Sequence, residues 1–273
     1  MSGVKFVQEL LTDYSFMLEC ELSSSVIEEV RQHWQEKISN GIVLTEVKNR
    51  GTVDFSEHMR EMHSLARFEG DVVDNLFKGR WKPKAGGDKV SELHYFGIGL
   101  GTGLAQVVPV ANRARHEIVA YDTCQIGCDN GAKVFAQQNS KYKNRVLLAD
   151  IHFACKRRYI RPGKASKLIV PRVLDVLDTQ DPDREKKLPR ERKMAKTARR
   201  IGELLRHLEV LLIHPCKEDN LNAVCGDCTL HSLSEVLEYM EEGRKGKLDA
   251  QVLGTTSFFG HIYTAVVIGS KKP

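Results

Sequence analysis

Strand-like and helix-like segments alternate along the chain from residue 92 onward, and this alternation limits the folds available to it. Short apolar runs with the composition of buried strands lie at 92–98, 116–122, 144–151, 166–174 and 209–215. Segments typical of helices lie between these runs, around 104–114, 127–139 and 188–208. This order predicts a mostly parallel sheet with helices on both faces.

The last two strand-like segments, 249–259 and 261–271, follow one another with no helix between them. Because parallel strands need a long crossover connection, one of the two must run antiparallel as a hairpin. We therefore predict an α/β fold with a Rossmann-like, seven-stranded, mostly parallel sheet that ends in an antiparallel C-terminal hairpin.

The first 90 residues have a different pattern. SSSVIEEVRQHWQEKI and DFSEHMREMHSLARFEGDVVDNLF have helical spacing of their apolar residues, whereas 78–89 is rich in Gly, Pro and Lys. The pattern predicts a helical N-terminal extension over 1–90, a linker at 78–89, and an α/β domain over 91–273.

Composition favours an intracellular setting. No apolar run reaches the roughly 20 residues of a membrane span, and the start MSGVKFVQELLTDYSF lacks the pattern of a secretory signal. Seven cysteines, an odd number, are consistent with reduced thiols. We expect a nuclear or cytoplasmic protein without a membrane partner, whose net charge of +5 permits an acidic one.

A glycine-rich stretch, HYFGIGLGTGLAQ at 94–106, follows the first predicted strand of this domain. Such a cluster indicates tight turning or a close approach of the backbone to a ligand. The dinucleotide pattern G-x-G-x-x-G does not fit, because its sixth position is Thr102 when counted from Gly97 and Leu104 when counted from Gly99.

Two aspartates end the next strands. Asp122 closes IVAYD and lies 19 residues after Gly103, while Asp150 closes VLLAD. The carboxyl ends of parallel strands meet at one edge of the sheet, where an acidic residue about 20 positions past the loop is placed to accept hydrogen bonds from ribose hydroxyls. The spacing predicts a nucleoside site at this edge.

The loop G-x-G-x-G at 99–103, the two aspartates and the terminal strand pair together resemble the class I S-adenosylmethionine-dependent methyltransferases over about residues 90–272. The resemblance implies that the domain at 91–273 binds S-adenosyl-L-methionine: the loop glycines admit its methionine part, Asp122 holds its ribose, and Asp150 with Ile151 brackets its adenine. The residues implied in cofactor binding are Gly97, Gly99, Leu100, Gly101, Thr102, Gly103, Asp122, Thr123, Asp150 and Ile151.

The chain departs from this family at one position. The family usually has an acidic residue two positions before the first glycine of the loop, where it contacts the cofactor amine, and Gly97 stands there in this sequence. Either a backbone or water contact replaces the acid, or cofactor binding is weaker.

Chemistry is expected after the fourth and fifth strands, where Asp175, Cys216 and Lys217 are the candidate catalytic residues. The Asn/Asp-Pro-Pro-aromatic motif of amino-directed DNA and glutamine methyltransferases is absent from IVPRVLDVLD. Cys216 matches the nucleophile position of RNA cytosine-5 methyltransferases, although their second cysteine is missing, and Asp175 with Lys217 matches half of the tetrad of ribose methyltransferases. The alternatives are a capping aspartate and a buried, unreactive cysteine.

GTGLAQVV and SFFGHIYTAVV are similar to segments of the non-SET histone lysine methyltransferases of the telomeric-silencing type. That resemblance implies a lysine channel lined by Phe258, Phe259 and Tyr263. The alternative, which we favour, is that the same residues are aromatics in the core of the sheet.

Two further segments suggest ligands. Nine lysines and arginines lie in 183–200. Their charge predicts contact with the phosphate backbone of nucleic acid or with a nucleosome-like polyanion. The alternative is that they form the solvated face of a helix. Cys216, Cys225, Cys228 and His231 have spacing that zinc sites use, although free thiols fit as well and no metal site is assigned.

These observations predict a methyltransferase (EC 2.1.1.-) that acts on a macromolecule, with RNA slightly favoured because of the basic segment. One alternative is a histone or protein lysine methyltransferase. The other is a non-catalytic subunit with the methyltransferase fold that binds nucleic acid.

Overall fold

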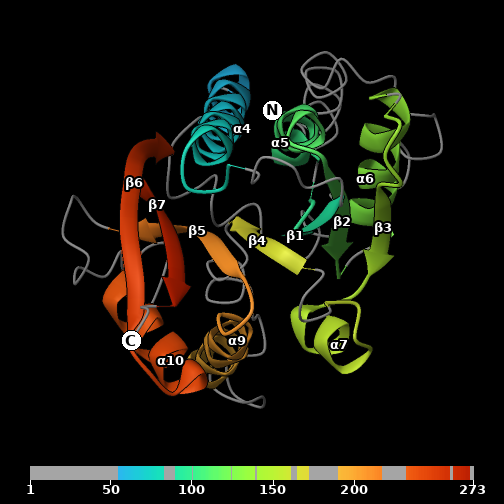
Figure 1. Cartoon of the computed structure of the whole chain (residues 1–273). Helices are drawn as coiled ribbons and strands as arrows, with labels where there is room; N and C mark the ends of the chain where they lie inside the picture. The colour runs from blue at the N-terminus through green and yellow to red at the C-terminus, as the bar shows by residue number, and fades with distance from the viewer. Residues whose placement is uncertain are drawn as a thin grey trace.

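The computed structural model describes residues 55–82, 90–99, 101–123, 125–138, 140–160, 165–171, 190–216, 232–258 and 261–270. The helix predicted from SSSVIEEVRQHWQEKI lies outside these residues, and the proposed division of the chain at residue 90 stays a prediction. Figure 1 shows a central sheet with helices on both sides.

The sheet has seven strands in the order β3-β2-β1-β4-β5-β7-β6. β1 to β5 run parallel to one another, whereas β7 is antiparallel to both of its neighbours, β5 and β6. The predicted fold class is therefore confirmed, including the C-terminal hairpin. The strands are β1 Ser91–Phe96, β2 His116–Asp122, β3 Arg145–Leu148, β4 Ala165–Pro171, β5 Glu209–Cys216, β6 Leu248–Phe258 and β7 His261–Ser270.

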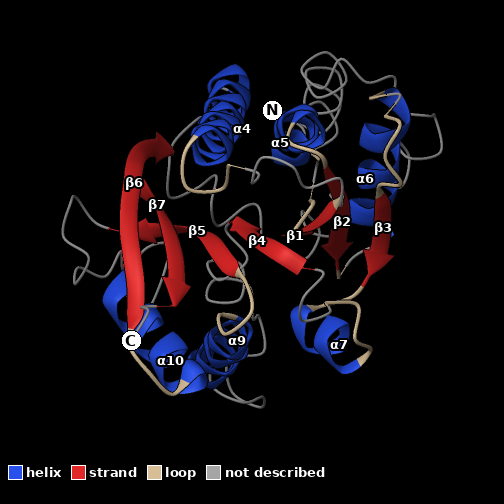
Figure 2. Cartoon of the chain, viewed as in Figure 1, coloured by secondary structure: helices blue, strands red, loops and turns tan. Residues whose placement is uncertain are grey.

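The helices are α4 Phe55–Lys78, α5 Thr102–Arg113, α6 Gln125–Gln137, α7 Ile151–Lys156, α9 Arg190–Leu204 and α10 Leu233–Arg244. Buried residues of α4, α5 and α6 form one hydrophobic cluster with one face of the sheet. Buried residues of α7, α9 and α10 form a second cluster on the other face. Figure 2 shows these helices (blue) on either side of the strands (red). Alternate residues of a strand point to opposite faces, so the central strands contribute to both clusters.

The segment predicted as a linker is held in the fold at its start. Trp81 is only 2 % exposed and belongs to the same hydrophobic cluster as α4. Arg80 forms ion pairs with Glu209 of β5 and Asp249 of β6. The linker prediction is therefore wrong for Arg80 and Trp81, because a Gly-, Pro- and Lys-rich composition does not reveal an aromatic anchor.

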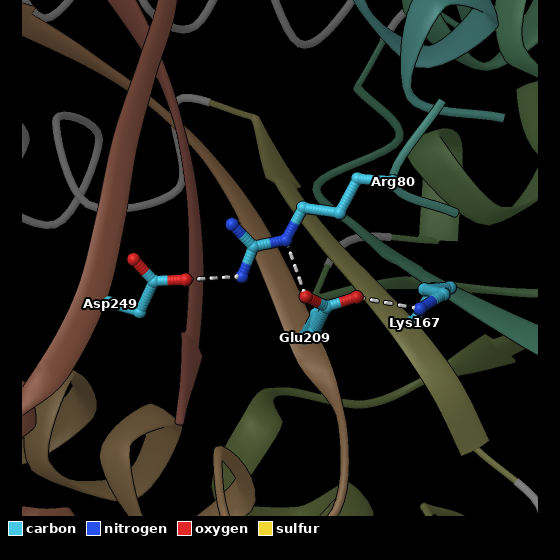
Figure 3. Close-up of polar contacts among 4 residues, drawn as sticks. All are labelled: Arg80, Lys167, Glu209 and Asp249. Atoms are coloured by element: carbon cyan, nitrogen blue, oxygen red, sulfur yellow. Dashed lines mark hydrogen bonds and ion pairs between the residues drawn. The ribbon is translucent and has the colours of Figure 1, made fainter. Parts of the chain in front are cut away.

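A network of four charged side chains joins this segment to the amino edge of the sheet, the edge where the parallel strands begin (Figure 3). Arg80 Nε lies 2.5 Å from Glu209 Oε1 and its Nη2 lies 3.0 Å from Asp249 Oδ2. Lys167 Nζ lies 2.8 Å from Glu209 Oε2, and also lies over the Trp81 ring. Burial alone would raise the pKa of Glu209, but the hydrogen bonds from Lys167 and Arg80 hold that pKa below its ordinary value.

Helices α9 and α10 touch through two glycines. A Cβ atom at Gly202 would overlap the carbonyl oxygen of Met240, and one at Gly243 would overlap the carbonyl oxygen of Arg199. The backbones of the two helices therefore lie against one another at this point. α10 begins with a capping box, in which the Ser232 side chain accepts from the Glu235 N–H and the Glu235 carboxylate accepts from the Ser232 N–H.

Candidate cofactor site

The glycine loop between β1 and α5 turns sharply through backbone that only glycine adopts easily. Gly97, Gly99 and Gly101 have φ values of +81°, +53° and +85°. The Gly97 N–H donates to the Tyr121 carbonyl at 2.9 Å, and the Gly101 N–H donates to the Ile98 carbonyl at 2.9 Å. The loop is thus fastened to β2 at its start and closed on itself before α5 begins.

Asp122 holds the middle of this loop. Its Oδ2 accepts a hydrogen bond of 2.8 Å from the Gly99 N–H, and Asn130 of α6 donates to the Gly99 carbonyl at 3.0 Å. A Cβ atom at Gly127 would overlap the Asp122 carboxylate, so the carboxylate lies against the first turn of α6. A carboxylate has about four acceptor positions, so Asp122 can hold the loop and still accept from a ligand hydroxyl.

The loop glycines differ in what surrounds them. A Cβ atom at Gly99 would meet nothing within 4 Å, and Gly99 is exposed. One at Gly101 would lie 3.1 Å from Val134 Cγ2 of α6. The open side of Gly99 is therefore where a ligand can approach the backbone of the loop.

Gly103 is enclosed by protein. A Cβ atom there would overlap the Glu69 carboxylate of α4 and would lie 2.6 Å from the Tyr95 hydroxyl oxygen of β1. The role implied for Gly103, to admit the methionine part of the cofactor, stays a prediction. The side of Gly103 where a side chain would stand is filled by these two polar groups.

Asp150 follows β3 and begins α7. Its carboxylate caps that helix by accepting from the Phe153 N–H at 2.6 Å. The sequence placed residues 144–151 in one strand, but β3 ends at Leu148 and Ile151 is the first residue of α7. Ile151 is buried, whereas Asp150 and Thr123 are exposed. These residues follow the paired ends of β2 and β3, where Asp122 lies opposite Leu148.

The structure thus brings Gly97, Gly99, Gly101, Asp122 and Asp150 to one edge of the sheet, where β1, β2 and β3 end. Leu100 lies outside the described residues. Asp175, Lys217 and the Cys216 side chain also lie outside them, so the three catalytic candidates stay predictions.

The late aromatic residues lie within the hydrophobic core. Phe258 and Tyr263 are 9 % and 5 % exposed, their ring centroids are 5.6 Å apart, and both belong to the cluster on the α4–α5 face. Phe259 is outside the described residues. The alternative of a sheet core therefore describes Phe258 and Tyr263, and the resemblance to histone lysine methyltransferases stays a prediction.

The described part of the basic segment is partly neutralised. On α9, Arg199 pairs with Glu242 of α10 at 2.6 Å, and Arg200 pairs with Glu203. Lys196 is exposed. Contact between 183–200 and a polyanion stays a prediction.

A zinc site has no support among the residues that the structure describes, where no group of three or more His, Cys, Asp or Glu side chains is arranged to hold a metal. The predicted ligands Cys225, Cys228 and His231, and the side chain of Cys216, lie outside that part of the chain. Within the same part, none of the helices combines the length and apolarity that crossing a bilayer requires.

Sequence reasoning missed three residues that shape this edge: Glu69, Tyr95 and Asn130. Glu69 had a detectable signal, because it is an acid on the buried apolar stripe of α4 that includes Leu65, Val72 and Val73. Asn130 and Tyr95 are ordinary residues within a helix and a strand. Only the tertiary structure brings them to the loop.

The donor set fits S-adenosylmethionine. The open side of Gly99 lets a ligand reach the loop backbone, Asp122 offers an acceptor for ribose hydroxyls, and Asp150 follows on the neighbouring strand. Carboxylates also suit the cofactor's cationic groups.

Comparison with known proteins supports the fold. No protein-family model matches the sequence, and no curated protein sequence matches it. Among solved structures, the magnesium protoporphyrin IX methyltransferase ChlM from Synechocystis PCC 6803, with bound SAM, is similar over 80% of this chain and 85% of its own, with a TM-score of 0.50 and 13% identity. An O-methyltransferase family protein from Burkholderia thailandensis is similar over 90% of this chain and 72% of its own, with a TM-score of 0.51 and 14% identity.

A third similar structure is the bifunctional kinase-methyltransferase WbdD, with a TM-score of 0.50 and 13% identity over 76% of this chain. The chain spans only 39% of the length of that protein. These likenesses, together with the strand order, show that the chain has the fold of the class I S-adenosylmethionine-dependent methyltransferases.

Proposed function

We propose that the protein is an S-adenosylmethionine-dependent methyltransferase. The observation that carries the proposal is the arrangement at the carboxyl edge, where Asp122 Oδ2 holds the Gly99 N–H of an open glycine loop at 2.8 Å. Asp150 lies after the next strand of the same edge. The presence of bound SAM in the similar ChlM structure supports the same ligand.

In this proposal each residue has a binding role. Asp122 accepts hydrogen bonds from the ribose hydroxyls, Gly99 lets the ligand pass close to the backbone, and Asp150 with Ile151 borders the adenine. When bound, the cofactor would supply a methyl group for transfer: the acceptor would bond to the methyl carbon while the carbon–sulfur bond breaks, leaving S-adenosylhomocysteine. The protein contributes orientation, and a basic group removes the acceptor's proton where the acceptor carries one.

For the acceptor, RNA remains our first candidate, supported by the nine lysines and arginines of 183–200. A small molecule is the second candidate. It is favoured by the ion pairs that neutralise Arg199 and Arg200, and by the porphyrin named for the similar methyltransferase ChlM. Two other possibilities are that the acceptor is a basic protein such as a histone, or that the protein is a non-catalytic subunit. The transfer experiment below distinguishes them.

Calorimetric titration with S-adenosylmethionine tests cofactor binding. The wild-type protein and the control Asp71→Asn, an exposed residue of α4, are expected to bind, whereas Asp122→Ala is expected to bind at least about tenfold more weakly. Wild-type protein that does not bind, or an unchanged affinity in Asp122→Ala, would contradict the proposal.

Transfer of labelled methyl groups to total RNA, histones, DNA and a small-molecule extract, in parallel reactions, identifies the acceptor. Label in RNA supports the first candidate, and label only in the extract supports the second. Label in protein would favour a protein methyltransferase, and binding without any transfer would favour the non-catalytic subunit.

A further inference from the structure

A buried carboxylate lies against the glycine loop, and no role in the proposed site has been given to it. Glu69 of α4 is 2 % exposed. Its carboxylate occupies the space where a Cβ atom of Gly103 would stand, next to the Tyr95 hydroxyl. Gly103 is the second residue of α5, so the carboxylate lies at the first turn of the helix that the loop begins.

The first turn of α5 lacks negative charge of its own. No acidic residue lies in it, and its N-cap is Gly101, which provides no side-chain hydrogen bond. The N–H groups of a first helical turn carry about half a unit of positive charge in sum. In its ionised form, Glu69 places a negative charge at this turn from another helix, opposite in sign to the partial charge of the N–H groups.

This negative charge matters for the choice of ligand. The N-terminus of a helix that follows a glycine-rich loop ordinarily attracts phosphate. A buried carboxylate at the same turn repels a pyrophosphate and attracts a cation, and burial makes both effects stronger because water screens them less. The methionine end of S-adenosylmethionine carries an ammonium group, a sulfonium and a carboxylate, so its net charge is positive, whereas a pyrophosphate carries only negative charge.

We propose that Glu69 sets the charge selectivity of the glycine loop: it strengthens binding of the cationic methionine end of the cofactor and disfavours ligands with a pyrophosphate. This inference rests on the proposed function and adds a specificity-determining residue to the site. It also provides an acidic group near the loop in a chain where Gly97 provides none.

The test compares four ligands by calorimetry on the full chain. They are S-adenosylmethionine, S-adenosylhomocysteine, which keeps the ammonium group, adenosine, which lacks the methionine end, and ADP, which carries a pyrophosphate. The variants are Glu69→Gln, which keeps the shape and removes the charge, and Asp71→Asn, which removes an exposed charge from the same helix.

We expect Glu69→Gln to bind S-adenosylmethionine about tenfold more weakly, from the loss of one nearby charge, and S-adenosylhomocysteine more weakly by a smaller factor, because it keeps the ammonium group but lacks the sulfonium. Its affinity for adenosine should stay within about twofold, and ADP should gain relative to adenosine. Opposite effects on the two kinds of ligand cannot arise from general damage to the fold, which weakens all four together. Asp71→Asn should resemble the wild type.

An unchanged affinity of Glu69→Gln for S-adenosylmethionine, or an equal loss for all four ligands in a folded protein, would overturn the inference while the proposed function stands. Wild-type protein that binds no S-adenosylmethionine would overturn both. If Glu69→Gln does not fold, Glu69→Asp is measured instead, since it withdraws the charge by one methylene group. It should shift the same affinities in the same directions by a smaller factor, and no shift would overturn the inference.

Discussion

The two edges of the sheet consist of different residues and are held by different contacts. At the carboxyl edge, glycines with positive φ and a few hydrogen bonds hold the loop, and the half-buried Asp122 and the exposed Asp150 lie beside it. At the amino edge, Arg80, Lys167, Glu209 and Asp249 form a network of ion pairs between the segment after α4 and three strands (Figure 3).

We therefore expect the carboxyl edge of the sheet to determine ligand binding and the amino edge to contribute mainly to stability. Substitutions at the amino edge should lower the free energy of unfolding without altering cofactor affinity. Substitutions at the carboxyl edge should affect affinity, and should affect stability only where the side chain also holds the protein together. Asp122 both holds the loop and has a proposed binding role, and Gly103 lies in the same loop with close packing around it, so the separation is not expected to hold for these two residues.

The largest effect is expected for Gly103→Ala. Alanine in a helix normally adds stability over glycine, but here its Cβ would overlap the Glu69 carboxylate and lie 2.6 Å from the Tyr95 oxygen. We expect the unfolding free energy to fall by about 3 kcal/mol, the upper end for overpacking. Gly99→Ala is the matched control, with open space around the new Cβ and a cost of about 1 kcal/mol for its positive φ. Urea unfolding measures both, and equal losses would argue against close packing at Gly103.

Asp122→Asn comes next. It removes the negative charge of the carboxylate that accepts a hydrogen bond from the Gly99 N–H and that we propose to hold the ribose. The affinity for S-adenosylmethionine should fall about 30-fold, which corresponds to about 2 kcal/mol. Asp129→Asn, a half-buried residue of α6 that bonds Gln125, should leave the affinity nearly unchanged in the same calorimetric titration. Similar affinities in the two variants would remove Asp122 from the site.

Glu209→Gln tests the amino edge. It weakens the contacts with Arg80 and Lys167, so the unfolding free energy should fall by about 1–2 kcal/mol. Cofactor affinity should not change by more than about twofold, because Glu209 begins β5 at the opposite edge. Glu203→Gln, which loses an exposed pair with Arg200, should cost less than about 0.5 kcal/mol. A clear loss of affinity in Glu209→Gln would contradict the separation of the two edges.

The same variant has a characteristic pH dependence. The pKa of Glu209 is lowered in the folded protein, so its contribution is complete above the unfolded pKa of about 4.3 and is lost as pH falls through the folded pKa. The difference in unfolding free energy between wild type and Glu209→Gln should therefore be constant near neutral pH and shrink below about pH 4.3. Urea unfolding at several pH values measures it, and a gap that widens in acid would show that the pKa is not lowered.

Substitutions of Asp150 should have the smallest effect on stability and affinity, and they test whether this residue of the carboxyl edge binds the cofactor or only caps α7. Asp150→Ala removes the N-cap of α7 and should cost about 1 kcal/mol or less, because α7 is short. Asp150→Ser restores a capping oxygen without the carboxylate. If Asp150 also borders the adenine, both variants should bind the cofactor a few-fold more weakly, while only the alanine variant loses stability by thermal unfolding. Wild-type affinity in both variants would limit Asp150 to capping.

Much of the sheet could be predicted from the sequence, because the alternation of apolar runs and helices indicates mostly parallel strands, whose carboxyl ends meet at one edge. The strand order came only from the structure. β2 begins and ends where the sequence predicted, at His116 and Asp122, since charged and turn residues border its apolar run. α7 was missed because the apolar run continues through Ala149 and Ile151, and only the capping bond of Asp150 separates strand from helix.

The candidate site was predictable as a set of strand ends but not as a set of contacts. Spacing placed Asp122 near the loop, and the structure adds its bond to Gly99. No local sequence pattern predicts that the Glu69 side chain fills the space beside Gly103, because the two residues are 34 positions apart in the sequence. Contacts between helices distant in sequence depend on how both pack on the sheet, and a periodicity records only that a face is buried.

The close approach of Gly202 to the backbone of α10, and of Gly243 to the backbone of α9, restricts which residues these two positions can accept. What each missing side chain would meet is the backbone of the opposite helix, so no substitution of a neighbouring residue can make room for it. An exposed charge of α9 such as Lys196 can be exchanged without disturbing this contact, whereas each of the two glycines is required by the backbone that faces it. The spacing between α9 and α10 is therefore fixed by these two positions, whichever residues the exposed face of α9 carries.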